Sequence, residues 1–210
     1  MGSFKMTLSS KPYLIGITGT IGSGKSTVGK ILESLNICVI DTDHIVHDIL
    51  NNQNTVTTEI INTFGEEYKV DQDNNCFIIN RKLLGKLVFS NNDARKKLEK
   101  IIHPQTLINF KQLIDKNKAK PIIACLVPLL FEHNLNSMFN EIWTISCEET
   151  ILTKRIKLRD NLTANEINDR LYSQLPQNKK IELADFIIDN SKDIESTQKQ
   201  IIERLKILSG

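Results

Sequence analysis

Residues 13–27 read Tyr-Leu-Ile-Gly-Ile-Thr-Gly-Thr-Ile-Gly-Ser-Gly-Lys-Ser-Thr, and the fold can be worked out from this stretch. Its segment from Gly19 to Ser26 matches the pattern G-x-x-x-x-G-K-[ST] without a mismatch. An apolar run, Tyr13–Thr18, precedes the glycines and is typical of a buried strand. A helical pattern, Lys25–Leu35, follows them. The stretch therefore predicts a strand, a tight glycine-rich turn and a helix that begins at the turn.

Such a loop is suited to hold phosphate groups. Glycines let the backbone turn tightly, so that successive N–H groups point into one concavity. Lys25 can reach the β- and γ-phosphates of a nucleoside triphosphate, Ser26 can bind Mg²⁺, and the helix presents its positive dipole end. The alternative is a glycine-rich turn with an incidental lysine. We predict a nucleoside-triphosphate site made by Gly19, Thr20, Gly22, Ser23, Gly24, Lys25, Ser26 and Thr27.

Further apolar runs predict a parallel sheet. They are apolar almost throughout, without the alternation of a half-exposed sheet, which is typical of parallel strands covered on both faces. Helical patterns separate them, so we predict an α/β fold with right-handed crossovers. The predicted strands are Tyr13–Thr18, Ile37–Asp41, Pro121–Val127 and Glu141–Cys147, with a fifth candidate at Asp185–Asp189. The helical patterns include Lys25–Leu35, Asp93–Ile102 and Glu148–Leu158.

The predicted strands are unevenly spaced along the chain. A long stretch, Thr42–Lys120, separates the second strand from the third; it is rich in helical pattern and lacks strong strand signals. A connection of that length is expected to form a subdomain. A second inserted stretch, Arg159–Ala184, is polar and helical and precedes the last strand. Local polar turns are expected at Asn51–Asn54 and Asp71–Asn75.

Composition and charge exclude several classes of protein. The 210 residues are 40% hydrophobic and 25% charged, which excludes disordered, collagen-like and disulfide-scaffold proteins. The net charge of +2 gives no overall field for nucleic acid or an anionic membrane, so we expect neither as a partner. The longest apolar run, Ile122–Phe131, contains Pro128 and is too short to span a bilayer.

The N-terminus and the cysteines point to an intracellular protein. Residues 1–11 hold no apolar segment of secretory length and are expected to be a flexible lead-in, so the expected location is the cytoplasm. The cysteines, Cys38, Cys76, Cys125 and Cys147, form no C-x-x-C pair, and three of them lie in apolar runs. This favours buried small hydrophobic side chains over zinc or redox chemistry.

Two carboxylates follow the second predicted strand, in the sequence Asp41-Thr-Asp43-His44. Ligands collect at the carboxyl ends of the strands in open α/β sheets. An extended i, i+2 spacing would place Asp41 and Asp43 on the same side. One could hold a water of the Mg²⁺ shell, and the other could accept a proton from an attacking hydroxyl; which carboxylate bears the proton stays open. The alternative is that Asp43 only caps a helix over Ile45–Leu50.

Arginines are unevenly distributed. The chain holds six, at positions 81, 95, 155, 159, 170 and 204, so half lie between Arg155 and Arg170. Arg155 and Arg159 are spaced i, i+4 on a predicted helix and share a face, where guanidinium groups suit bidentate binding of a phosphoryl group. The polar segment after them is then expected to be a lid that excludes water. The alternative is a solvated helix whose arginines pair with Asp160, Glu166 and Asp169.

The ordered set of motifs resembles the dephospho-coenzyme A kinase family over residues 13–205. The landmarks are Thr18-Gly-Thr-Ile-Gly-Ser-Gly-Lys-Ser-Thr27, Val39-Ile-Asp-Thr-Asp43, Ile102-His-Pro104, Val127-Pro-Leu-Leu-Phe-Glu132, Arg155-Ile-Lys-Leu-Arg-Asp160, Ser173-Gln174 and Ala184-Asp-Phe-Ile-Ile-Asp-Asn190. The phosphate-binding loop, or P-loop, is widespread, but the ordered set is specific.

The resemblance implies a P-loop kinase fold, a three-layer sandwich with a five-stranded parallel sheet. A single domain is expected over residues 12–210. Its core would comprise 12–43, 120–158 and 185–210, with a helical acceptor-binding insertion over 44–119 and a lid over 159–184. The implied reaction moves the γ-phosphate of ATP to the 3′-hydroxyl of dephospho-CoA with Mg²⁺, the last step of coenzyme A synthesis. The oligomeric state is left open between a monomer and a weak homo-oligomer.

The resemblance also implies roles for individual residues. Asp43 resembles the family's general base, with a contact to the acceptor; Lys25 and Ser26 resemble the phosphate and magnesium contacts. Arg155 and Arg159 resemble lid arginines. The segment around Asn190 resembles the loop that approaches adenine, and Asp41 would support the metal. For His103 the alternatives are a substrate contact and a hydrogen-bonded histidine at a helix junction.

The chain departs from the family pattern at a few positions. His47 stands where an arginine is frequent after the second aspartate, and Leu126 where many members have an aspartate, so the magnesium site would depend more on Asp41 and Asp43. Ser191 replaces a frequent glycine after Asn190. The competing functions are another small-molecule or nucleoside-monophosphate kinase, and a nucleotide-dependent switch or ATPase.

Overall fold

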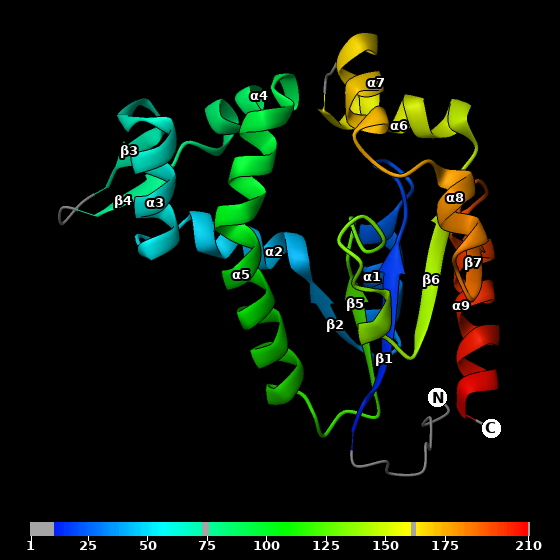
Figure 1. Cartoon of the computed structure of the whole chain (residues 1–210). Coiled ribbons are helices and arrows are strands. Elements are labelled where there is room, and N and C mark those ends of the chain that lie inside the picture. The colour runs from blue at the N-terminus through cyan, green and yellow to red at the C-terminus, as the bar shows by residue number, and fades with distance from the viewer. Residues whose placement is uncertain (1–10, 73–75, 161–162, 210) are drawn as a thin grey trace. The chain divides into compact units, whose positions relative to one another are not determined.

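A computed structural model describes residues 11–72, 76–160 and 163–209 of the chain (Figure 1). The expected lead-in, residues 1–11, lies outside the described residues except for Lys11. The chain forms two compact units: one contains the residues up to Asp41 and those from Ile114 onward, and the other is Thr42–Leu113. None of the described helices is long and apolar enough to cross a membrane.

The first unit is built on a five-stranded parallel sheet, which confirms the predicted fold class. The strand order is β2-β5-β1-β6-β7. β1, which leads into the P-loop, therefore lies in the middle of the sheet and pairs with β5 and β6. The strands are β1 (Tyr13–Thr18), β2 (Cys38–Asp41), β5 (Ile122–Leu126), β6 (Glu141–Ser146) and β7 (Phe186–Asp189).

Alternate residues of β1 face different layers. Ile15 and Ile17 are fully buried in a core shared with residues of α1 (Lys25–Ser34) and α9 (Ile194–Ser209). Burying such a side chain contributes roughly 1.5–3 kcal/mol. Gly16 lies against other residues: a Cβ at this position would come within 2.7 Å of Leu130 and Phe139. Both faces of the central strand are thus covered, as its continuous apolar sequence predicted.

The other helices of the first unit follow β6 and precede β7. They are α6 (Glu149–Asp160), α7 (Ala164–Tyr172) and α8 (Gln177–Glu182), and a short 3₁₀ helix, η3 (Asn136–Met138), precedes β6. The stretch predicted to be polar and helical over Arg159–Ala184 does contain helices. The side chain of Thr163 caps α7 through the N–H of Glu166, whose carboxylate bonds back to the N–H of Thr163 in a capping box.

The second unit contains helices and one small sheet. Its helices are α2 (Thr42–Leu50), α3 (Thr55–Phe64), η1 (Glu66–Tyr68), α4 (Arg81–Ser90) and most of α5 (Asn92–Lys116). Asparagine side chains cap the N-termini of two of these helices. Asn54 accepts a hydrogen bond from the N–H of Thr57 in α3, and Asn80 accepts one from the N–H of Leu83 in α4. The expected polar turn at Asn51–Asn54 thus ends in a helix cap.

The second unit also contains strands, although its sequence lacks strong strand signals. Two strands, β3 (Lys69–Asp71) and β4 (Phe77–Ile79), pair antiparallel. Each contains only three residues, too few for a period-two pattern to stand out in the sequence. The predicted polar turn at Asp71–Asn75 begins at the end of β3, and residues 73–75 lie outside the described residues.

Candidate active site

The P-loop connects β1 to α1 and has the backbone that the glycine pattern requires. Gly22 has a φ of 80° and Gly24 a φ of 104°, a region that favours glycine. Gly24 is also the N-cap of α1 and has no side chain with which to cap the helix, and no acidic residue lies in the helix's first turn. The start of α1 thus presents its positive dipole end with no carboxylate of its own first turn beside it, and so suits an anion.

Two other elements pack directly onto the glycines. A Cβ at Gly22 would lie 2.6 Å from Cγ1 of Ile156 on α6, and a Cβ at Gly24 would collide with Nδ2 of Asn190, which follows β7. Substituting either glycine would therefore force apart segments that lie far from the loop in sequence.

Lys25 is half-buried and folds back onto its own loop. Its ammonium donates to the carbonyls of Gly19 and Thr20, at 2.6 Å and 3.1 Å. The ammonium of Lys25 therefore lies at the P-loop, and its contact with phosphates stays a prediction.

Two hydroxyls in the loop are buried. Thr20 is 4% exposed and Ser23 is fully buried, and among the described residues Oγ1 of Thr20 and Oγ of Ser23 have no hydrogen-bond partner. A buried hydroxyl without a partner costs roughly 1–3 kcal/mol, so such groups indicate a ligand that supplies acceptors. Phosphate oxygens are acceptors, and the loop therefore fits the phosphates of a nucleotide.

The residues predicted to bind metal lie on α1 and β2. Ser26 is exposed in the first turn of α1, and Asp41 is the half-buried last residue of β2, aligned with Leu126 of β5. A hydroxyl and a carboxylate are oxygen donors of the kind that Mg²⁺ accepts. Among the described residues no group of three or more His, Cys, Asp or Glu side chains could hold a metal by itself. Ser26 and Asp41 supply only two oxygen donors to an ion that prefers octahedral coordination, so substrate phosphates and waters would have to complete a Mg²⁺ site.

Asp43 lies in the second unit, and the structure contradicts both the expected spacing from Asp41 and the capping alternative. α2 begins at Thr42, immediately after β2, so Asp43 is exposed in the first turn of the helix. It is therefore not the cap of a helix over Ile45–Leu50. The extended i, i+2 spacing from Asp41 also fails, because the backbone is already helical between the two residues. A carboxylate in a first turn is nevertheless favourably placed relative to the helix dipole.

His103 also lies in the second unit and is half-buried within α5, a helix of 25 residues. The expected helix junction is absent from this position, because α5 continues through Pro104. The predicted helix over Asp93–Ile102 thus extends well beyond Ile102. A proline inside a helix removes one backbone hydrogen bond, and α5 tolerates this loss.

The two predicted lid arginines lie on α6 and have different partners. Arg155 is half-buried and donates to Sγ of Cys147 at 3.5 Å. Arg159 binds Asp160 with two hydrogen bonds of 2.7 Å and 2.8 Å, and Arg170 approaches the same carboxylate at 3.4 Å. The hydrogen bonds from Arg159 lower the pKa of Asp160 against the opposing effect of burial. The ion-paired alternative thus describes Arg159 and Asp160, whereas Glu166 caps α7.

Asn190 is buried and supports the P-loop. Its Nδ2 donates to the carbonyl of Ser23 at 2.7 Å, and its Oδ1 accepts from the hydroxyl of Thr197 at 3.0 Å. Both ends of the amide are therefore engaged. The prediction placed Asn190 in a loop that binds the nucleotide; the structure places its side chain against the loop that would hold the phosphates.

Three further residues at the P-loop were not singled out for a role. Gln174 accepts from the N–H of Ile21 at 2.9 Å, and Glu132 forms an ion pair with Lys180 at 2.9 Å. Glu132 and Gln174 belong to the sequence motifs that resemble the dephospho-coenzyme A kinase family, so the sequence could have indicated a role for them. Lys180 had none, since nothing in the sequence distinguishes it from its neighbour Lys179.

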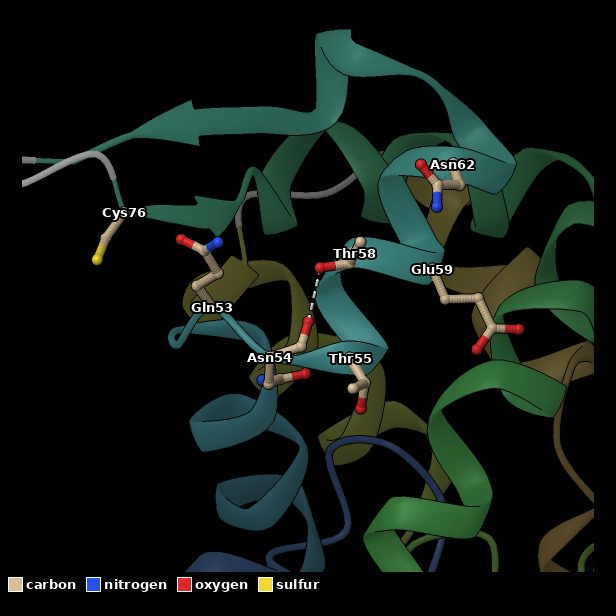
Figure 2. A pocket seen from close by; sticks show the side chains of 7 residues that line it. All are labelled: Gln53, Asn54, Thr55, Thr58, Glu59, Asn62 and Cys76. Carbon is tan, nitrogen blue, oxygen red and sulfur yellow. Dashed lines mark hydrogen bonds between the residues drawn. The ribbon is translucent and has the colours of Figure 1, made fainter.

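An open hollow of about 790 Å³ lies within the second unit (Figure 2). Seven residues line it: Gln53, Asn54, Thr55, Thr58, Glu59, Asn62 and Cys76. Figure 2 shows these side chains on α3, on the turn before it and beside β4, with the hydroxyl of Thr58 bonded to the carbonyl of Asn54 at 2.9 Å. Among the described residues, the lining side chains are amides, hydroxyls, one carboxylate and one thiol.

Comparisons with known proteins agree with this geometry. A sequence model described as dephospho-CoA kinase matches residues 13–196. The dephospho-CoA kinase of Carboxydothermus hydrogenoformans is 37% identical over 195 residues, which cover 92% of this chain and 93% of that protein.

Solved structures show the same fold. The dephospho-CoA kinase from Campylobacter jejuni matches with a TM-score of 0.65 at 30% identity, covering 93% of this chain and 96% of that one. A shikimate kinase from Acinetobacter baumannii matches with a TM-score of 0.53 at 14% identity and covers 94% of each chain, a likeness of fold alone. The length of the sequence match and the relatives' identity over nearly the whole chain lead to one conclusion: this chain belongs to the dephospho-CoA kinase family.

Proposed function

We propose that this protein transfers the γ-phosphate of ATP to the 3′-hydroxyl of dephospho-CoA, giving CoA and ADP. The observation that carries the proposal is the P-loop with its buried hydroxyls, Thr20 and Ser23, in a chain of this family. Both hydroxyls lack a partner among the described residues, and phosphate oxygens would supply the missing acceptors.

The P-loop would bind the triphosphate with backbone and side-chain donors together. The amides at the start of α1 and the hydroxyls of Thr20, Ser23 and Thr27 would surround the phosphate oxygens. Lys25 would exchange the carbonyls of Gly19 and Thr20 for phosphate oxygens, where its charge has more to neutralise.

Ser26 and Asp41 are the residues that would hold Mg²⁺, Ser26 directly and Asp41 through a water of the metal's shell. Bound there with the phosphates, the metal supplies neutralisation of the charge that develops on them. Because Asp41 is assigned to the metal, Asp43 is the carboxylate that would accept the proton of the attacking hydroxyl.

Asp43 is proposed as the general base. The bond from the ribose 3′-oxygen to the γ-phosphorus forms while the bond from that phosphorus to the bridging oxygen of ADP breaks. The proton of the attacking hydroxyl passes to the Asp43 carboxylate. His103, from the same unit as Asp43, is proposed to contact the acceptor.

The segment over 159–184 is proposed to act as a lid. Arg155 and Arg159 would add positive charge around the transferred phosphoryl group, and a closed lid would keep water from consuming ATP. Arg159 is more than half exposed and Asp160 holds it by a surface pair, an interaction worth about 0–1 kcal/mol. The guanidinium can therefore be released to a phosphate at little cost.

A coupled assay for ADP tests the proposal by comparing acceptors. Dephospho-CoA should support ADP formation at least about 100-fold faster than AMP, CMP, shikimate or no acceptor. Turnover with another acceptor but none with dephospho-CoA would identify a different small-molecule kinase. A full rate without any acceptor would identify an ATPase.

A further inference from the structure

The side chain of Lys180 on α8 is fully buried, which is unusual for a lysine. Its neighbour Lys179 is exposed and pairs with Glu182 at the surface, at 2.8 Å. Burial lowers the pKa of Lys180, while the hydrogen bond and the charge of Glu132 act in the opposite direction. Lys180 therefore needs its carboxylate partner to keep a charge inside the protein.

Every hydrogen of the buried Lys180 ammonium has a hydrogen-bond acceptor within reach. Nζ of Lys180 lies 2.9 Å from Oε1 and 3.2 Å from Oε2 of Glu132, 2.9 Å from the carbonyl of Pro128 and 3.4 Å from Oγ1 of Thr18. An ammonium has three donors, and three residues supply acceptors. Because its donors are engaged and the side chain has no contact with solvent, Lys180 is not placed to bind a phosphate itself.

The ion pair contacts the residue that directly precedes the P-loop. Thr18 is the last residue of β1, directly before Gly19, and its hydroxyl also donates to the carbonyl of Pro128 at 3.1 Å. The ammonium of Lys180 thus bridges the ends of two neighbouring strands, β1 and β5, at the edge where the loop begins.

The same pair anchors the later part of the segment that is proposed as a lid. Oε1 of Glu132 accepts from the N–H of Leu175 at 2.8 Å. One residue earlier, Gln174 accepts from the N–H of Ile21 inside the P-loop. The return segment, defined here as Ser173–Lys180, is therefore fixed both to the loop and to the ion pair behind it.

We propose that Glu132 and Lys180 are positioning residues for phosphoryl transfer, which set the start of the P-loop and hold the return segment against it. The inference rests on the proposed function, because its effect is expected in that reaction. A buried ion pair contributes little stability compared with apolar side chains of the same size, so stability alone does not explain why the chain uses one here. A role in placing the P-loop explains the ion pair, because a misplacement of about 1 Å at a phosphoryl-transfer site can cost roughly 100-fold in rate.

The test separates placement from stability with a charge-free double variant. Lys180→Met and Glu132→Gln each leave one buried charge unpaired and should lower the melting temperature. The double variant Lys180→Met/Glu132→Gln removes both charges, so most of the melting temperature should return. Its kcat should stay about 10- to 100-fold below wild type, with the KM for dephospho-CoA changed by less than about threefold. Lys179→Met, the exposed neighbour, is the matched control and should behave as wild type.

The outcomes are distinct. A double variant with both the wild-type melting temperature and the wild-type kcat would show that the pair is structural only, and would overturn the inference. If the double variant does not fold, Thr18→Val answers the same question, because it removes the hydroxyl contact without unpairing a charge. It should lower kcat several-fold with little change in the KM for dephospho-CoA, and a wild-type kcat would again overturn the inference. If the wild-type protein itself shows no activity with dephospho-CoA, the proposed function fails instead.

Discussion

The side-chain amide of Asn190 donates a 2.7 Å hydrogen bond to the carbonyl of Ser23, 167 residues earlier in the chain. The contact joins the end of β7 to the P-loop, and Gly24 makes room for it, since a Cβ there would collide with Nδ2 of Asn190. The hydroxyl of Thr197 on α9 holds the other end of the amide. The shape of the phosphate-binding loop therefore depends on the last strand and the last helix of the chain.

Asn190→Ala is expected to weaken both the fold and nucleotide binding. It leaves the Ser23 carbonyl without this donor in a buried position, which should cost about 1–3 kcal/mol in the free energy of unfolding. Calorimetric titration with a non-hydrolysable ATP analogue should show an affinity several-fold lower. Asn178→Ala, at an exposed position on α8, is the control and should leave both quantities within error. Wild-type affinity in Asn190→Ala would mean that the loop keeps its shape unaided.

Lys25→Ala should abolish turnover. Removing a cation from the transferred phosphoryl group costs about 100- to 1,000-fold or more in kcat, by analogy with other preorganised donors. Steady-state ADP release with saturating dephospho-CoA measures the loss. Lys30→Ala removes an exposed lysine from the same helix and should retain full activity. Equal rates for the two variants would contradict the role given to the P-loop.

Asp43→Asn should reduce kcat far more than ATP binding. An amide cannot accept the hydroxyl proton, and loss of a general base typically costs about 100- to 10,000-fold. The dissociation constant for the ATP analogue should change by less than about threefold, because Asp43 is not a P-loop residue. Asp48→Asn, also exposed on α2, controls for the loss of a charge. An unchanged kcat would leave Asp43 as a first-turn carboxylate that only favours the helix dipole.

Acid should destabilise the first unit through Asp189. The hydrogen bonds from Ser191 lower the pKa of Asp189. In one of them the N–H of Ser191 donates to Oδ1 of Asp189 at 2.9 Å. A carboxylate with a lowered folded-state pKa contributes stability above its unfolded pKa of about 3.9, and this contribution is lost as the pH falls through the folded value.

Urea unfolding near neutral pH and at about pH 3 measures this loss. Asp189→Asn should be less stable than wild type near neutral pH, and the difference should shrink in acid. A difference that stayed constant with pH would exclude titration of Asp189 as its cause.

The boundaries of the strands were the most predictable part of the fold. β1 begins and ends at the predicted residues, and the other four strands of the large sheet begin or end within one residue of the prediction. Strands buried on both faces are apolar at most positions, so their composition indicates them without knowledge of their neighbours. The pair β3 and β4 gave no such signal, because β3 carries the charged residues Lys69 and Asp71 and β4, although apolar, is only three residues long.

Helix boundaries were less predictable where a residue locally favours another start or end. α2 begins at Thr42, although Asp43 resembles a capping residue before an apolar run. α5 continues through Pro104, although a proline usually ends a helix. In both cases the surrounding structure outweighed a preference worth a few kcal/mol at most.

The position of the P-loop could be predicted from the sequence, because such a turn depends on local backbone sterics: glycine can adopt a positive φ without steric cost, and the motif lies between a strand and a helix that the sequence also predicts. Tertiary structure alone decided which polar residues support that loop. Lys179 and Lys180 are adjacent and chemically identical, yet one is exposed and the other is buried against Glu132. The difference follows from the face of α8 that turns toward β6, and the packing of distant segments, rather than any local pattern, sets that face.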